Sequence, residues 1–202
     1  MPSPRPSPRL GVFGGTFDPP HVGHLVAAVN VRHALELDRV LLVVANVPWQ
    51  KVGEREITPA PDRLAMVEAA AQGVAGIEAS RIEIDRGGSS YTADTLAALR
   101  DQYVEPELFL IVGSDAAGGL TTWERVDEVR DGCTVVVVDR PGAEGEQPPA
   151  GWRWLRVEVP RLEVSSTDLR ARVTDGRPLD YLLPPGVIEC IRSRGLYAVA
   201  VR

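Results

Sequence analysis

Short runs of aliphatic and β-branched residues alternate along the chain with longer stretches in which apolar residues recur every three or four positions. The short runs predict strands buried on both faces, and the longer period predicts helices with one buried side. Strands that alternate with helices are typical of a mostly parallel sheet, so we expect an α/β fold. The expected strands are Leu10–Phe13, Val40–Ala45, Ile77–Ile84, Leu108–Val112, Thr134–Val138 and a short one near Trp154–Val157.

Helices are expected in the stretches between these strands. The first should span about His21 to Leu37, with a buried stripe made of Val22, Leu25, Val26, Val29 and Leu35. Residues 140–151 are rich in Pro, Gly and Glu, which predicts a surface loop. The chain contains no internal repeat, and we expect a single domain. The other helices are predicted at Asp62–Gln72, Thr92–Tyr103, Trp123–Arg130, Thr167–Thr174 and Gly186–Arg194.

The length of 202 residues suits one domain that buries roughly 70% of its unfolded surface. No apolar run approaches the ~20 residues that cross a bilayer, so we expect no contact with a membrane. Residues 1–9 alternate proline with polar residues and lack an apolar run, which predicts a disordered leader rather than a signal peptide. The folded domain should then cover residues 10–202.

Cysteine usage and charge narrow the class of protein further. Cys133 and Cys190 lie 57 positions apart without a CxxC neighbour, which argues against a disulfide framework or a zinc ribbon and favours the cytoplasm. The net charge of −6 argues against nucleic-acid binding. Residues 151–202 hold nine Arg against six acidic residues, so an anion site should draw on this segment.

The strongest chemical signal is the run GGTFDPPHVGH, from Gly14 to His24, at the turn between the first strand and the first helix. Gly14 and Gly15 allow backbone N–H groups to approach a bulky anion, and a helix N-terminus attracts phosphate. The turn, which includes Thr16 and Phe17, is therefore a candidate phosphate site. It has neither the GxGxxG spacing nor the GK[ST] ending of the common nucleotide motifs.

His21 and His24 are three positions apart at the start of the first helix, so both imidazoles can face the same group. Donors fixed around a phosphoryl group stabilise the charge that develops during nucleotidyl transfer. The alternatives are a pair of helix-capping histidines or a metal site. A metal site would need a third ligand, and no HExxH or similar cluster follows, so we expect no protein-held metal. His33 should lie on the solvated side of the helix.

The run GGTFDPPHVGH resembles the T/HxGH motif of the nucleotidylyltransferase superfamily, in the form found in bacterial nicotinate-mononucleotide adenylyltransferases. The resemblance extends from Gly11 to about Tyr197 through further blocks in the same order. It implies a Rossmann-like, doubly wound sheet in a single domain. It also implies transfer of AMP from ATP to nicotinate mononucleotide, with release of pyrophosphate and with Mg²⁺ accompanying ATP.

Two of these blocks are implied to bind nicotinate mononucleotide. The run from Ser89 to Leu96 is similar to the family's SYTxDTL, which assigns Tyr91 and Thr92 to the nicotinate. From the residues alone, Thr92 is a candidate N-cap beside N–H groups that suit a carboxylate, and it could equally cap a helix and nothing more. Trp123 matches the family's LxxW; an indole can stack on a pyridine ring or pack in the core.

Three blocks are implied to bind ATP or phosphate. Gly113-Ser114-Asp115 is similar to the family's GxD, whose carboxylate suits a ribose or adenosine hydroxyl, although Asp115 could also be the N-cap of a turn. Residues 164–170 are similar to ISSTxIR; Ser165, Ser166 and Thr167 would aim N–H groups at phosphate, and Arg170 would bind the β and γ phosphates. Lys51, the single lysine, keeps the last position of a PPHK-like stretch in which Gln50 replaces the family's His, and it should contact substrate phosphate.

Taken together, these motifs predict an enzyme with separate subsites for its two small-molecule substrates. His21, His24, Arg170 and Lys51 are the expected catalytic residues. A sister adenylyltransferase acting on nicotinamide mononucleotide or phosphopantetheine, a cytidylyltransferase, and a nucleotide-binding regulator without turnover remain as alternatives. Whether the chain forms a homo-oligomer is left open. The expected ATP-binding residues are Gly14, Gly15, Thr16, Phe17, Gly113, Asp115, Ser165, Ser166 and Thr167, and those for the mononucleotide are Tyr91, Thr92 and Trp123.

Overall fold

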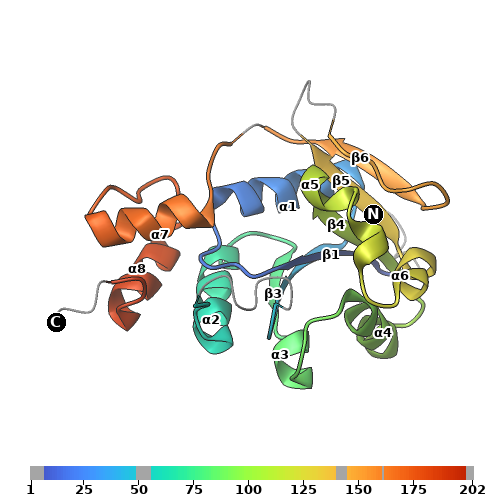
Figure 1. Cartoon of the computed structure of the whole chain (residues 1–202), viewed down its shortest axis with the longest axis horizontal. Coiled ribbons are helices and arrows are strands. Elements are labelled where there is room, and N and C mark those ends of the chain that lie inside the picture. Colours follow the sequence, from blue (N-terminus) through green and yellow to red (C-terminus); the bar gives the residue numbers. More distant parts are fainter. Residues whose placement is uncertain (1–6, 49–55, 140–144, 161, 199–202) are drawn as a thin grey trace.

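The computed structural model describes residues 7–48, 56–139, 145–160 and 162–198. Within these ranges, six strands form one sheet in the order β3-β2-β1-β4-β5-β6 (Figure 1). Every pairing between neighbouring strands is parallel, which confirms the α/β class and goes beyond the expected mostly parallel sheet. The strands are β1 (Arg9–Gly15), β2 (Arg39–Val44), β3 (Ile77–Ser80), β4 (Glu107–Gly113), β5 (Thr134–Asp139) and β6 (Trp154–Glu158).

Helices cover both faces of the sheet, as a doubly wound fold requires. Side chains of β4 alternate: Phe109 and Ile111 pack with α1 and α2, whereas Leu110 and Val112 pack with α4, α5 and α6. Among the described helices, none combines the length and the apolar character needed to cross a bilayer. The helices are α1 (Val22–Ala34), α2 (Ala60–Ala71), α3 (Ile82–Arg86), α4 (Thr92–Gln102), α5 (Ser114–Ala117), α6 (Val126–Gly132), α7 (Ser166–Asp175) and α8 (Pro185–Arg194).

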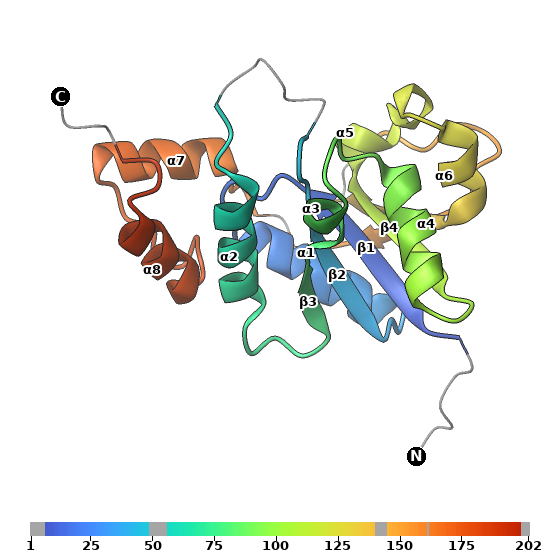
Figure 2. The ribbon, with the colours of Figure 1, turned by 90° about the horizontal axis from the view of Figure 1, so that it is seen from below.

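The C-terminal helices α7 and α8 lie beside α2, at the end of the molecule opposite α6 (Figures 1 and 2). Their contact is a separate apolar cluster in which Met66 of α2 packs with Leu169 of α7 and Ile188 of α8. This packing returns the last part of the chain to the neighbourhood of the β1–α1 turn, as the hydrogen bond from Val22 N–H to the Leu182 carbonyl at 3.1 Å indicates.

Two predicted elements are wrong in detail. The strand expected over Ile77–Ile84 ends at Ser80, and α3 follows, because Arg81 and Asp85 form an i,i+4 ion pair while Ile82 reaches the core. The helix expected over Trp123–Arg130 begins only at Val126. It is preceded by a 3₁₀ turn over Leu120–Thr122 and by Arg125 in a left-handed conformation.

The buried stripe of α1 also differs from the prediction. Ala27, Ala28 and Val31 face the core, whereas Val29 is exposed. Small alanine side chains let the helix lie close to the sheet, so the larger aliphatic residues are displaced to the flanks. His33 is exposed, as expected. At the N-terminus, β1 already begins at Arg9, and residues 1–6 of the predicted leader lie outside the described residues.

Candidate active site

A pocket of about 260 Å³ lies at the carboxyl ends of β1 and β4, and the start of α4 forms part of its wall. These two strands are neighbours at the point where the strand order reverses, which is where open α/β sheets bind their ligands. Residues far apart in the sequence meet there. From the predicted site, the pocket gathers Gly14, Gly15, Thr16, Tyr91, Thr92, Gly113 and Trp123.

The two glycines of the β1–α1 turn serve different purposes. A Cβ atom on Gly14 would meet no atom within 4 Å, so this position faces open space. A Cβ on Gly15 would lie 2.9 Å from the ring of Phe17, so Gly15 makes room for that ring. Phe17 is only 2% exposed and packs edge-on against Phe13 and His24. Its side chain supports the turn, which leaves its backbone as the part able to contact a nucleotide.

The imidazole rings of His21 and His24 stack, with centroids 3.7 Å apart and an interplanar angle of 27°. Gly23 permits this arrangement, because a Cβ there would lie 3.0 Å from Nδ1 of His21. Nδ1 of His24 accepts a hydrogen bond from the backbone N–H of His21 at 3.1 Å. That bond fixes the neutral tautomer of His24, so its Nε2 carries the proton and can donate to a phosphate oxygen.

His21 is the more deeply buried of the pair, with 9% of its surface exposed. Within the described part of the chain, its Nδ1 is the one buried side-chain nitrogen or oxygen without a hydrogen-bond partner. Burial lowers the pKa of His21 to about 4, so the ring is neutral near pH 7. His21 can therefore act there as a polar group of fixed orientation and not as a cation.

The N-terminus of α1 is partly occupied by contacts within the chain. The N–H group of Val22 donates to the Leu182 carbonyl, and the N–H groups of His24 and Leu25 donate to the His21 carbonyl. The first turn is therefore less open to an anion than the sequence suggested. The histidine side chains, and not the full set of helix N–H groups, are the chemically distinctive part of this turn.

The block at residues 165–170 reaches the same turn from α7. Ser165 caps the helix by accepting from the N–H of Asp168 at 3.2 Å. The Ser166 hydroxyl donates to the Pro19 carbonyl at 2.8 Å. Arg170 donates through Nη1 to the Asp18 carbonyl at 2.8 Å and through Nη2 to Thr167 Oγ1 at 3.2 Å. The predicted phosphate-binding residues of α7 thus lie against the loop that carries the two histidines.

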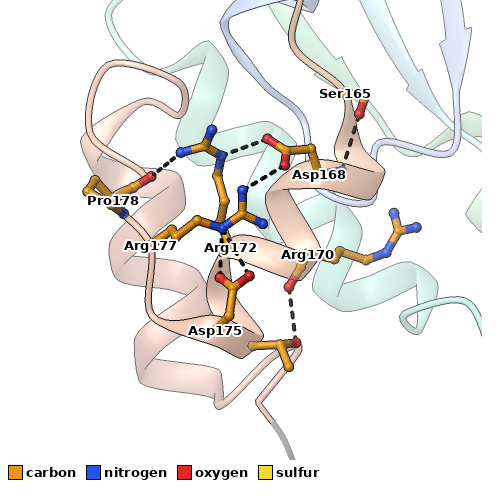
Figure 3. A network of polar contacts seen from close by, with 8 residues as sticks. Ser165, Asp168, Arg170, Arg172, Asp175, Arg177 and Pro178 are labelled. Atoms are coloured by element: carbon orange, nitrogen blue, oxygen red, sulfur yellow. Dashed lines mark hydrogen bonds and ion pairs between the residues drawn. The ribbon is translucent and has the colours of Figure 1, made fainter.

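Figure 3 shows that Arg170 points away from the other arginines of this region. Arg172 and Arg177 both bind the carboxylate of Asp168, at 2.6 and 3.1 Å. Arg177 also pairs with Asp175 at 2.9 Å. Hydrogen bonds from these guanidinium groups hold the pKa of Asp168 below its usual range. The ion pairs engage Arg172 and Arg177, whereas Arg170 faces the turn.

On the nicotinate side, one expectation needs correction. The N-cap position of α4 is Tyr91, whose side chain does not cap the helix, and Thr92 is the first helical residue. Both residues line the pocket, so the helix start still faces it. Trp123 lines the pocket and also packs against the core, and its stacking on a pyridine ring stays a prediction. Glu83 and Glu124 line the pocket as well.

Not every predicted residue belongs to the pocket wall. Asp115 is exposed in the first turn of the four-residue helix α5, whose N-cap is Gly113, and it does not line the pocket. Lys51, with Trp49 and Gln50, lies outside the described residues. Within the described ranges, no three His, Cys, Asp or Glu side chains are gathered where they could hold a metal ion.

Two buried polar residues lie near the site; no role for Arg63 was predicted from the sequence, and Asp18 was assigned no firm role. Arg63 of α2 is 1% exposed and binds three main-chain carbonyl groups. The sequence does contain a pattern that indicates the burial of Arg63. Position 63 shares the helical spacing of Met66, Val67 and Ala70, which places a charged side chain on the buried face of α2. Asp18 is also 1% exposed, and its carboxylate accepts from the hydroxyl of Tyr197 at 2.7 Å. No short-range pattern links these two residues, which are 179 positions apart.

Comparison with known proteins agrees with this geometry. Residues 12–172 match the family model described as cytidylyltransferase-like. The chain is 46% identical to a probable nicotinate-nucleotide adenylyltransferase of Corynebacterium kroppenstedtii, over 94% of this chain and 91% of that protein. A protein of the same name from Saccharopolyspora erythraea is also 46% identical, over 94% and 89% of the two chains.

Solved structures agree on the fold. The nicotinic acid mononucleotide adenylyltransferase of Plasmodium falciparum, complexed with NaAD, superposes with a TM-score of 0.75 at 16% identity, over 94% of this chain and 97% of that one. A putative nicotinate-nucleotide adenylyltransferase from Vibrio parahaemolyticus gives a TM-score of 0.66 at 20% identity, over 94% and 95%. The match over residues 12–172 and the two relatives at 46% identity place the chain in the cytidylyltransferase-like family, among the nicotinate-nucleotide adenylyltransferases.

Proposed function

We propose that the protein transfers AMP from ATP to the 5′-phosphate of nicotinate mononucleotide, giving nicotinic acid adenine dinucleotide and pyrophosphate. The observation that carries this proposal is the pocket at the β1–β4 switch point. It joins the Gly14–Thr16 turn, which suits phosphate, to the start of α4 and to Trp123, which suit a carboxylate and an aromatic ring. The names of the relatives at 46% identity support the same pair of substrates.

The proposed step is an in-line displacement without a protein nucleophile. A 5′-phosphate oxygen of the mononucleotide forms a bond to the α-phosphorus of ATP. The bond from that phosphorus to the bridging oxygen of the β-phosphate breaks, and pyrophosphate leaves with the electron pair. Nε2–H of His24 would donate to the phosphoryl oxygens as their charge rises, and Arg170 would bind the distal phosphates.

Mg²⁺ enters this proposal together with ATP. Asp18, the carboxylate of the turn, is 1% exposed and already accepts from Tyr197, so the side chains here suit an ion carried by phosphate oxygens and water. When bound, such an ion would neutralise charge on the phosphates. The free thiols of Cys133 and Cys190 fit a reducing compartment such as the cytoplasm, which is the proposed location.

One observation favours the amide acceptor, nicotinamide mononucleotide, as a second candidate. Glu83 lines the pocket with an acidic side chain that is 7% exposed, and a carboxylate accepts from an amide N–H but repels another carboxylate. The Thr95 hydroxyl already donates to Glu83 at 2.5 Å, which reduces its demand for a further donor. The acid therefore stays the first candidate.

The test is pyrophosphate release from ATP and Mg²⁺ with nicotinate mononucleotide, nicotinamide mononucleotide or phosphopantetheine as acceptor. We expect the highest kcat/KM with nicotinate mononucleotide and no release without an acceptor. Preferred use of either other acceptor would replace the proposed substrate. ATP binding without turnover of any acceptor would instead favour a nucleotide-binding regulator.

A further inference from the structure

The buried guanidinium of Arg63 binds main-chain carbonyl groups in two loops beside the pocket. Its Nε donates to the Thr58 carbonyl at 2.7 Å, Nη1 to the Thr16 carbonyl at 2.8 Å and Nη2 to the Asn46 carbonyl at 3.1 Å. Thr16 follows β1 and lines the pocket, Asn46 follows β2, and Thr58 precedes α2. The guanidinium therefore joins the β1–α1 turn to both ends of the connection between β2 and α2.

The hydrogen bonds continue from Asn46 to the other side of the pocket. The N–H of Asn46 donates to the Ser90 hydroxyl at 2.8 Å, and its side-chain amide donates to the Gly88 carbonyl at 2.9 Å. The N–H of Ser90 in turn donates to the Val47 carbonyl at 3.1 Å. Ser90 lines the pocket immediately before Tyr91. A continuous path thus runs from the Gly14–Thr16 turn through Arg63 and Asn46 to the start of α4.

We propose that Arg63 is a positioning residue that fixes the phosphate side of the pocket relative to the nicotinate side. The inference rests on the proposed function, because only a reaction between two bound substrates needs this relation to be fixed. In-line transfer is sensitive to misplacement of the reacting atoms, and an error of about 1 Å can cost about 100-fold in rate. Binding of either substrate alone uses one side of the pocket and does not need the connection.

The planar guanidinium of Arg63 suits this positioning role better than the ammonium group of a lysine would. A guanidinium presents rigid donors in three directions, whereas an ammonium is a compact charge on a flexible stem. Arg63→Lys keeps a positive charge and much of the buried stem but cannot reach all three carbonyl groups at once. The position on α2 also matters, since Arg63 lies on its buried side beside Met66 and Val67. The helix therefore carries the guanidinium on a rigid support.

The test compares Arg63→Lys with the wild type in three measurements: substrate affinity, turnover and backbone exchange. We expect the dissociation constants for ATP alone and for nicotinate mononucleotide alone to change by less than about threefold, and kcat to fall about 30- to 100-fold. Hydrogen–deuterium exchange should rise in both loops, around residues 16–17 and 88–91. A merely structural role would instead lower both affinities and kcat together.

A second variant keeps the proposal testable if Arg63→Lys fails to fold. Asn46→Ala removes only the side-chain bond to Gly88, and we expect the same pattern at a smaller scale, with kcat about 3- to 10-fold lower and both affinities retained. The matched control is Arg194→Met, which breaks the 2.6 Å ion pair to Asp62 at the start of the same helix and should change neither kcat nor affinity.

Two outcomes would overturn the proposal: an unchanged kcat in folded Arg63→Lys, or a fall in kcat accompanied by an equal loss of affinity for both substrates. Failure of the proposed function would look different. Wild-type protein would then release no pyrophosphate with nicotinate mononucleotide, and the comparison would be repeated with whichever acceptor the wild type uses. The exchange measurement needs no turnover, so unchanged exchange around residues 88–91 in folded Arg63→Lys would overturn the connection by itself.

Discussion

His21 and His24 form a stacked pair in which each ring has a different constraint. The backbone N–H of His21 fixes the tautomer of His24, while burial keeps His21 neutral. The sequence spacing predicted that both imidazoles could face one group, and the rings do stack. It could not predict which ring is buried, because that depends on Phe17 and on the C-terminal segment packed over the turn.

The low pKa of His21 predicts a specific pH dependence of stability. The unfolded chain binds the proton with a pKa near 6.5 and the folded chain near 4, so the free energy of unfolding should fall as the pH drops from 6.5 to 4. The contribution of this one group is about 3 kcal/mol. Urea unfolding at pH 7 and pH 4 should therefore show that His21→Gln loses about 3 kcal/mol less stability than the wild type over this range.

The control for this measurement is His33→Gln, which removes an exposed histidine of the same helix. It should lose stability with decreasing pH as the wild type does. Equal pH dependence in His21→Gln and the wild type would mean that His21 is not the group that resists protonation in the folded state.

His24 is the histidine whose Nε2–H would donate to phosphate in the proposed step, and its loss should affect the rate more than the fold. One preorganised donor to a developing charge is worth roughly 3–4 kcal/mol, so His24→Ala should lower kcat by about 10²–10³-fold. Steady-state pyrophosphate release measures this effect. The assigned role is wrong if folded His24→Ala stays within threefold of the wild-type rate.

At the scale of single elements, α7 presents Arg170 to the turn, while Arg172 of α7 and Arg177 just after its end form ion pairs with Asp168. Arg170→Ala should therefore weaken ATP binding more than binding of nicotinate mononucleotide, and Arg170→Lys should recover only part of the loss. Isothermal titration with each substrate measures both affinities. Arg177→Ala is the matched control on the ion-paired side and should leave ATP affinity unchanged. Equal weakening of both substrates by Arg170→Ala would remove Arg170 from the distal phosphates.

The start of α4 should discriminate between the acid and the amide of the acceptor. N–H groups at a helix N-terminus donate to a carboxylate with charge assistance, worth roughly 1.5–3 kcal/mol, so kcat/KM should favour the acid by about 10- to 150-fold. Trp123→Ala should weaken both acceptors similarly, because stacking on the pyridine face scarcely depends on the substituent. The measurement is kcat/KM for the acid and for the amide mononucleotide, in the wild type and in Trp123→Ala. Equal kcat/KM for acid and amide in the wild type would contradict the expected preference for the acid.

A helix or strand was predictable from the sequence where a single local pattern, such as an apolar run, determined its secondary structure. The buried strands β1, β2, β4 and β5 follow from their apolar runs. The short helix α3 was missed because Ile82 and Ile84 repeat at the two-residue spacing of a strand, although they fall out of phase with Ile77 and Ala79 of β3. The Arg81–Asp85 pair at i,i+4 was the contrary signal.

At the scale of the whole molecule, the strand order places the β1 turn beside the end of β4. This arrangement brings seven of the predicted site residues together in the pocket wall, namely Gly14, Gly15, Thr16, Tyr91, Thr92, Gly113 and Trp123. The parallel α/β pattern and the motifs were sufficient to predict that meeting. Contacts that depend on global packing were not predictable. Arg63 holds loops 17 and 47 positions away, and Tyr197 reaches Asp18 across nearly the whole chain.

Gly14 allows a test of whether the pocket at the β1–β4 switch point transfers AMP to nicotinate mononucleotide. A Cβ on Gly14 would clash with no atom of the protein and would project into open space at the pocket wall. We predict that the wild type forms nicotinic acid adenine dinucleotide and pyrophosphate in equal amounts. Gly14→Val should keep a wild-type melting temperature and lose at least about 100-fold in kcat/KM. Unchanged kcat/KM in Gly14→Val, or no dinucleotide from the wild type, would contradict AMP transfer in this pocket.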